Sequence, residues 1–113
     1  MHISIEKRDD SIIVKPNGRI DSHCVQEFEA QLYSTISNAS DQIVVLDMAN
    51  VEFISNGGLR AVLAGMKKCQ EARCKLRVAG LNSVVEELFQ ISRVNTVVDC
   101  FDAVDLALTA TVH

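Results

Sequence analysis

The feature that most constrains the fold is the alternation of short apolar runs with segments of helical periodicity. The run Ile43-Val44-Val45-Leu46 has the length and continuity of a strand that is buried on both faces of a sheet. An amphipathic helix pattern precedes it, with apolar residues at three- and four-residue steps: Val25, Phe28, Leu32 and Ile36. Strands that are joined through helices become parallel neighbours, so the pattern predicts an α/β fold.

The rest of the chain continues this alternation. Residues 2–7 and 11–15 read as a hairpin that ends at Pro16-Asn17-Gly18, and strand-like runs return at residues 75–79 and 97–101. Helical patterns begin near Gly58, Ser83 and Asp102. The predicted order is therefore ββαβαβαβα, a mixed β-sheet with an N-terminal hairpin and about four α-helices, in a single domain over residues 1–113. The residues expected in its core are Val44, Leu46, Leu63, Met66, Val78, Leu88 and Phe89.

The composition excludes several classes of partner and site. The formal net charge is -4, so the chain offers no overall cationic surface for nucleic acid. No apolar run is long enough to cross a bilayer and residues 1–10 lack a signal-peptide layout, which predicts a cytoplasmic protein without membrane insertion. The cysteines Cys24, Cys69, Cys74 and Cys100 show no CxxC spacing, and the histidines are scattered. We therefore expect no metal and no cofactor, and four reduced thiols, since Cys69 and Cys74 do not share one helix face.

Catalytic motifs are also missing from the sequence. It contains no GxxxxGK[ST], no GxGxxG and no nucleophile elbow. The best candidates for acid, base and nucleophile, Asp21, Asp47 and Ser55, do not form a recognisable set. The sequence thus predicts a protein that is not an enzyme.

A longer pattern lies around the central strand. Residues 43–60 read IVVLDMANVEFISNGGLR: a buried strand that ends in Asp, an aromatic residue, a short turn with Ser, then Gly-Leu and a helix. This stretch resembles the signature of STAS domains, the family of bacterial anti-sigma factor antagonists. Gly18-Arg19-Ile20-Asp21 is similar to the family's Gly-x-Leu-Asp turn, and Leu88-Phe89-Gln90-Ile91 lies where the family has a similar helix end. The resemblance covers nearly the whole chain and implies the STAS fold.

The turn of residues 55–58 carries the regulatory chemistry that the resemblance implies. In sporulation-type members it reads Asp-Ser-Ser-Gly-Leu, and a serine in it is phosphorylated by a partner that is both kinase and anti-sigma factor. Here an ungapped reading places Ser55 on the Asp, Asn56 on the first Ser and Gly57 on the second. Members with Ser-Ser-Ala-Gly use the position of Asn56. The acceptor hydroxyl is absent at both positions, so we expect the phosphorylation switch to be lost.

Ser55, Gly57 and Gly58 each have two interpretations. Ser55 is either a displaced phosphorylation site or, as we favour, an N-cap of the following helix. The two glycines either supply a positive φ that the turn requires or leave a bare backbone that a partner can approach closely. These interpretations of the glycines are compatible.

A basic segment follows the turn. Arg60, Lys67, Lys68, Arg73, Lys75 and Arg77 accompany one acidic residue, Glu71, so this segment carries +5 and the remainder -9. It is either a solvated helix face or a docking surface for an acidic patch.

The expected function is a regulatory module that binds an anti-sigma factor or a histidine-kinase-like ATPase. The predicted partner-binding residues are Arg19, Asp21, Ser55, Asn56, Gly57, Gly58, Arg60 and Lys67. The alternative is a soluble STAS subunit of a transport complex, or a STAS domain that binds a small ligand or nucleotide.

Overall fold

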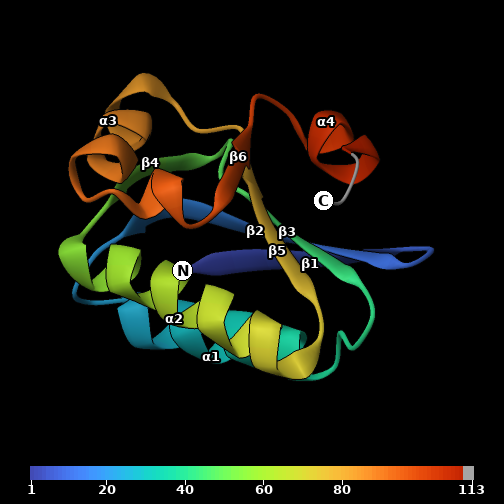
Figure 1. The fold of residues 1–113 in the computed structure, drawn as a ribbon. Coiled ribbons are helices and arrows are strands. Elements are labelled where there is room, and N and C mark those ends of the chain that lie inside the picture. The colour runs from blue at the N-terminus through green and yellow to red at the C-terminus, as the bar shows by residue number, and fades with distance from the viewer. Residues whose placement is uncertain (111–113) are drawn as a thin grey trace.

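A computed structural model of the chain describes residues 1–110. It contains a six-stranded mixed sheet in the order β1-β2-β3-β5-β6, with β4 paired to β2 outside that path (Figure 1). Among residues 1–110, the β1–β2 pair is the only antiparallel one, and the pairs β2–β3, β2–β4, β3–β5 and β5–β6 are parallel. The strands are β1 His2–Arg8, β2 Ser11–Ile20, β3 Ile43–Asp47, β4 Val51–Ile54, β5 Lys75–Ala79 and β6 Asp99–Phe101. The helices are α1 Val25–Ser37, α2 Asn56–Ala72, α3 Ser83–Ile91 and α4 Val104–Thr109, with a 3₁₀ turn, η1, at Val94–Thr96.

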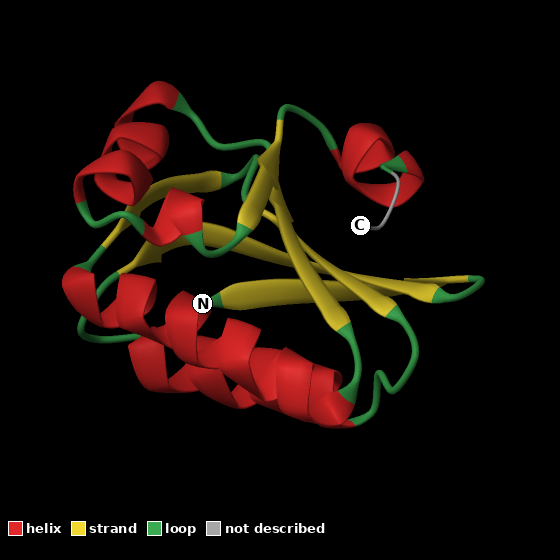
Figure 2. Ribbon diagram, in the orientation of Figure 1, coloured by secondary structure: helices red, strands yellow, loops and turns green. Residues whose placement is uncertain are grey.

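The helices cover the two faces of the sheet unequally. The long helices α1 and α2 lie side by side on one face, whereas the short α4 covers part of the other (Figure 2). Successive side chains of β2 point to opposite faces of the sheet. Ile12 and Val14 join the large core beneath α1 and α2, and Ile13 joins a small cluster with Ala107 of α4. The larger core therefore lies between the sheet and the α1–α2 pair.

The predicted element order is confirmed, and the structure adds the short strand β4 and the turn η1. Strand β2 does not end at Pro16 as predicted but continues to Ile20. Residues 15–17 of β2, which include Pro16, pair with neither β3 nor β4. Proline has no N–H to donate, and on the side of β2 that faces β3 and β4 no ladder hydrogen bond is lost.

Four of the predicted core residues are buried, namely Val44, Leu46, Val78 and Phe89. Three others, Leu63, Met66 and Leu88, are only partly buried against the core. The buried positions of α2 instead include small residues, among them Ala61 and Gly65.

The prediction of four reduced cysteines is wrong, because Cys69 and Cys74 form a disulfide. Helix α2 ends at Ala72 and Arg73 adopts a left-handed conformation, with φ 62° and ψ 37°. The chain then folds back, and the Cys74 amide donates to the Cys69 carbonyl at 2.8 Å. This C-cap brings the two Cα atoms to 4.8 Å although a continuous helix would separate the side chains. Cys24 and Cys100 are free thiols. Within residues 1–110, no helix combines the length and apolar character that a membrane span requires.

Candidate functional site

The candidate site lies where β2 and β4 end together. Their parallel register pairs Arg19 with Phe53 and Ile20 with Ile54. The Ser55 amide then donates to the Ile20 carbonyl at 2.8 Å and extends this pairing into the turn. The pairing places the predicted residues Arg19 and Asp21 next to the turn of residues 55–58, although more than thirty residues separate them in the sequence.

Ser55 is the N-cap of α2. Its backbone is extended, with φ -80° and ψ 170°, and its Oγ accepts a hydrogen bond from the Gly58 amide at 3.2 Å. The hydroxyl thereby satisfies one of the unpaired N–H groups of the first helical turn. Of the two interpretations of Ser55, the structure shows the N-cap.

The two glycines of the turn have different structural roles. The described glycines with positive φ are Gly18 and Gly80, so the predicted left-handed requirement at Gly57 and Gly58 is wrong. A Cβ on Gly58 would lie 2.6 Å from Ile54 Cγ1 and 2.9 Å from Ile20 Cγ2, so this position must be glycine for packing. A Cβ on Gly57 would meet its nearest atoms only at 3.7 Å. Gly57 therefore has room for a small side chain.

An exposed polar stripe leads away from the turn along α2. Asn56, Arg60 and Lys67 are all exposed, and steps of four and seven residues keep them on one side of the helix. Asn56 and Lys67 are eleven residues apart, or about 16 Å along the axis. The structure thus brings Asn56, Arg60 and Lys67 onto one surface that begins at the turn, whereas the prediction that Gly58 contacts a partner is wrong, because Gly58 is buried.

The rest of the predicted basic face is dispersed. Lys68 leans toward α1, with Nζ 5.0 Å from the centre of the Tyr33 ring. Arg77 is buried at 3% exposure and donates through Nη1 to the carbonyl of Ala107 in α4. Arg77 lies in the middle of β5, and its side chain is on the face of the sheet that α4 covers. It therefore cannot belong to a docking surface on α2, which covers the opposite face.

The side chains of Phe53 and Cys24 lie beside the turn, and neither is among the predicted site residues. The guanidinium of Arg19 lies 4.7 Å from the centre of the Phe53 ring, a cation–π arrangement that holds the arginine over β4. The Cys24 thiol donates to the Arg19 carbonyl at 2.9 Å. The alternation Val51-Glu52-Phe53-Ile54 is the signal that could have revealed β4, and with it the place of Phe53.

The carboxylate of Asp21 is anchored at the start of α1. Its Oδ1 accepts a hydrogen bond from the His23 amide at 3.0 Å. This backbone hydrogen bond, assisted by Cys24, His23 and Arg19, lowers the pKa of Asp21. Asp21 therefore adds a negative charge beside the positive charge of Arg19, so this part of the site carries both signs.

Comparison with known proteins identifies the family of the chain. Residues 2–107 match the STAS domain family. A candidate anti-sigma factor antagonist of Bordetella bronchiseptica, BtrV, is 30% identical over 92 residues, which cover 81% of this chain and 78% of that protein. The anti-sigma F factor antagonist of Paenibacillus polymyxa is 24% identical over 109 residues, covering 96% of this chain and 93% of that protein.

The solved structures extend the agreement to the fold. The crystal structure of an anti-sigma factor antagonist from Mycobacterium paratuberculosis superimposes with a TM-score of 0.86 at 19% identity, covering 96% of this chain and 91% of that one. The sequence match, the shared fold and the turn at the start of α2 lead to one conclusion: this chain belongs to the STAS domain family.

Proposed function

We propose that the protein is an anti-sigma factor antagonist that acts by binding a protein partner and is not switched by phosphorylation of its α2 turn. The observation that carries this proposal is the chemistry of residues 55–57. The family's two acceptor positions hold Asn56 and Gly57, and the nearby hydroxyl of Ser55 is already engaged by the Gly58 amide. Asn56 carries no charge, so the turn corresponds to the unphosphorylated, binding-competent state.

The partner that fits this proposal is an anti-sigma factor with a histidine-kinase-like fold. Both curated relatives described above carry the name of anti-sigma factor antagonist. The exposed stripe from Asn56 through Arg60 to Lys67 supplies polar contacts and positive charge that would complement an acidic patch. This activity is one of binding rather than catalysis, and it takes place in the cytoplasm with the transcription machinery.

The test is titration of the purified protein and its variants into the anti-sigma factor of the same organism, followed by calorimetry. Asn56→Asp adds negative charge where relatives carry phosphate, and should weaken the complex at least about tenfold, or about 1.4 kcal/mol. Asn56→Ser, which adds no charge, is the matched control and should bind as the parent does. Equal affinities for the parent and Asn56→Asp would remove the turn from the interface.

A second experiment tests the loss of the switch. Incubation with the same partner and ATP should leave the parent protein at its original mass. Gly57→Ser restores a hydroxyl at a position with room for a Cβ, and this variant should gain the mass of one phosphate. Stoichiometric phosphorylation of the parent at Ser55 would refute the proposal that the switch is lost.

The charged stripe makes a third contribution that can be separated from the turn. Lys67→Glu should slow association and change its dependence on salt, because Lys67 lies on the same side of α2 as Asn56. Lys68→Glu is its control, since Lys68 leans toward Tyr33 and away from this stripe. Equal effects of the two reversals would show that overall charge, and not the stripe, steers binding.

A further inference from the structure

A disulfide ties the end of α2 to the residue that precedes β5 (Figure 1). Cys69 lies in the last turn of α2, and Cys74 comes directly before β5. With 17 residues, α2 is about 25 Å long, so the disulfide at its end lies far from the turn at its start. The disulfide is therefore separate from the candidate site.

The compartment gives this disulfide a meaning. The proposed function places the protein in the cytoplasm, where glutathione and dithiol proteins keep thiols reduced. Disulfides that do form in that compartment are usually catalytic or redox-sensing. A disulfide in a cytoplasmic regulatory protein is therefore expected to form and break during the life of the protein.

The backbone around the two cysteines is held independently of their sulfur atoms. The Cys74 amide donates to the Cys69 carbonyl at 2.8 Å, and the Arg73 amide donates to the Gln70 carbonyl at 3.3 Å. These C-cap bonds need no disulfide, so the two thiols stay neighbours after reduction. The S–S bond can then form again by closing a loop of only five residues' separation, for which the loss of chain entropy is small.

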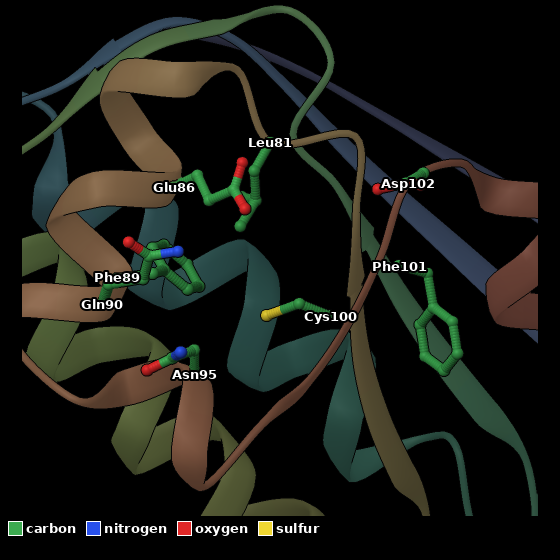
Figure 3. A pocket seen from close by; sticks show the side chains of 8 residues that line it. All are labelled: Leu81, Glu86, Phe89, Gln90, Asn95, Cys100, Phe101 and Asp102. Carbon is green, nitrogen blue, oxygen red and sulfur yellow. The ribbon is translucent and has the colours of Figure 1, made fainter.

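The two free cysteines are not placed to replace either partner. Cys24 lies beside the α2 turn, where its thiol donates to a carbonyl of β2. Cys100 projects from β6 into a small cavity beside α3, and the eight side chains that line this cavity include no second cysteine (Figure 3). Burial, and then neighbouring carboxylates, raise the pKa of the Cys100 thiol to about 11, so it stays protonated near pH 7 and is a poor nucleophile. Disulfide exchange within the chain is thus confined to Cys69 and Cys74.

We propose that Cys69 and Cys74 form a reversible redox site that exchanges with cytosolic thiols and sets how firmly the end of α2 is held. In reduction, a thiolate of a dithiol attacks the sulfur of Cys74, which is 7% exposed, whereas Cys69 is 0% exposed. A mixed disulfide forms at Cys74, the Cys69–Cys74 bond breaks, and Cys69 leaves as a thiolate that is then protonated.

The second thiol of the dithiol completes the reduction. It attacks the dithiol's own sulfur in the mixed disulfide, so the dithiol becomes a disulfide and Cys74 leaves as a thiolate that is protonated. Two electrons and two protons have then passed to the protein. In oxidation, Cys74 attacks glutathione disulfide and Cys69 attacks the resulting mixed disulfide, which releases two molecules of glutathione.

Two left-handed residues make the end of α2 sensitive to this bond. Arg73, which lies between the cysteines, has φ 62°, and Asp41, whose amide donates to the Arg73 carbonyl at 2.9 Å, has φ 64°. Neither residue is glycine, so these conformations are disfavoured and persist only where the surroundings hold them. The disulfide closes the turn around Arg73. Reduction removes this constraint, so the turn should open locally more often.

A redox titration of the intact protein tests the site. The protein is equilibrated in glutathione buffers of increasing oxidised fraction, quenched with acid, denatured and alkylated, and its free thiols are counted by intact mass. The count should fall from four to two in one two-electron step, with a midpoint inside the glutathione ratios of the cytosol. A pair that stays oxidised throughout this range, as a permanent crosslink would, or that stays reduced throughout, would overturn the proposal.

Variants assign the step to the pair. The matched control Cys24→Ser, Cys100→Ser keeps both partners and should show the same midpoint, whereas Cys74→Ser should show no step. A step that persists in Cys74→Ser would assign the exchange to other thiols and refute the site. Because the titration contains no partner protein, its failure would leave the proposed α2 interface intact.

Hydrogen exchange measures the effect on the end of α2. The amides of Asp41, Arg73 and Cys74 should exchange at least about tenfold faster in the reduced protein than in the oxidised protein. The Leu59 amide, which donates to the Ser55 carbonyl at the start of α2, is the internal control and should exchange equally in both forms. Equal rates for the three amides in both forms, or the same acceleration at Leu59, would contradict a switch at the end of α2.

Discussion

The start of α2 depends on the absence of a side chain at Gly58 but not at Gly57, and this difference can be measured. A Cβ at Gly58 would stand 2.6 Å from Ile54 Cγ1 and 2.9 Å from Ile20 Cγ2, both in the buried core. Forcing a methyl group into a packed core costs about 1–3 kcal/mol. The same methyl group at Gly57 would make ordinary contacts at 3.7 Å.

Both substitutions also gain helix propensity, since alanine is favoured over glycine by up to about 1 kcal/mol within a helix. This gain is common to the two variants and cancels when they are compared with each other. Gly58→Ala should therefore be less stable than Gly57→Ala by about 1–3 kcal/mol, and Gly57→Ala should equal or exceed the parent.

Urea denaturation followed by circular dichroism measures this difference. At an m-value of about 1.5 kcal/mol/M, the two midpoints should be roughly 0.7–2 M apart. Because the variants are neighbours with the same change in composition, each serves as the control for the other. Coincident midpoints would refute the close packing of Gly58 against Ile20 and Ile54, and with it the account of why the turn carries glycine there.

Three further predictions concern the core, the disulfide and pH. Phe89→Ala should cost about 3–5 kcal/mol in urea denaturation, whereas Ile91→Ala on the same helix, where the side chain is 72% exposed, should cost less than about 0.5 kcal/mol. Reduction of Cys69–Cys74, checked by thiol counting, should lower the free energy of unfolding by about 2 kcal/mol, because the closed loop is short. The lowered pKa of Asp21 predicts a stability contribution that is complete above its unfolded value of 3.8 and is lost as pH falls through the lower folded value. The stability advantage of the parent over Asp21→Asn should therefore be constant above that acidic range and disappear as pH falls through it.

The sequence predicted those parts of the fold that depend on periodicity. The apolar run of β3 and the spacing of α1 and α2 were sufficient because each pattern extends over several residues. Strand β4 was missed because four residues give little periodic signal, and its existence depends on pairing with the distant end of β2. The extension of β2 through Pro16 likewise depends on where its neighbours stop, which no local pattern records.

In the candidate site, too, features set by neighbouring residues could be predicted from the sequence, and features set by distant residues could not. The cap at Ser55 could be predicted because a serine hydroxyl directly before a helix bonds to an amide of the first turn, only a few residues away in the sequence. The steric role of Gly58 could not, because the atoms that exclude a side chain belong to Ile20 and Ile54 on two paired strands. The burial of Arg77 beneath α4 could not be predicted either, because it depends on a contact with Ala107, thirty residues further along the chain.

Strand β2 pairs in parallel with β3 along its first part and with β4 along its last part. This division affects how easily the pairing with β4 opens. Three residue pairs, with an irregularity after Gly18, attach β4 to β2, whereas seven pairs attach β1. Short pairings at a strand end open more readily than central strands, so the Ser55 amide should exchange its hydrogen faster than the amides of β3. Opening of this short pairing would release the turn while the rest of the sheet stays folded. The fraction of molecules with an attached turn, rather than the global stability, sets the apparent Kd for any partner that requires the turn.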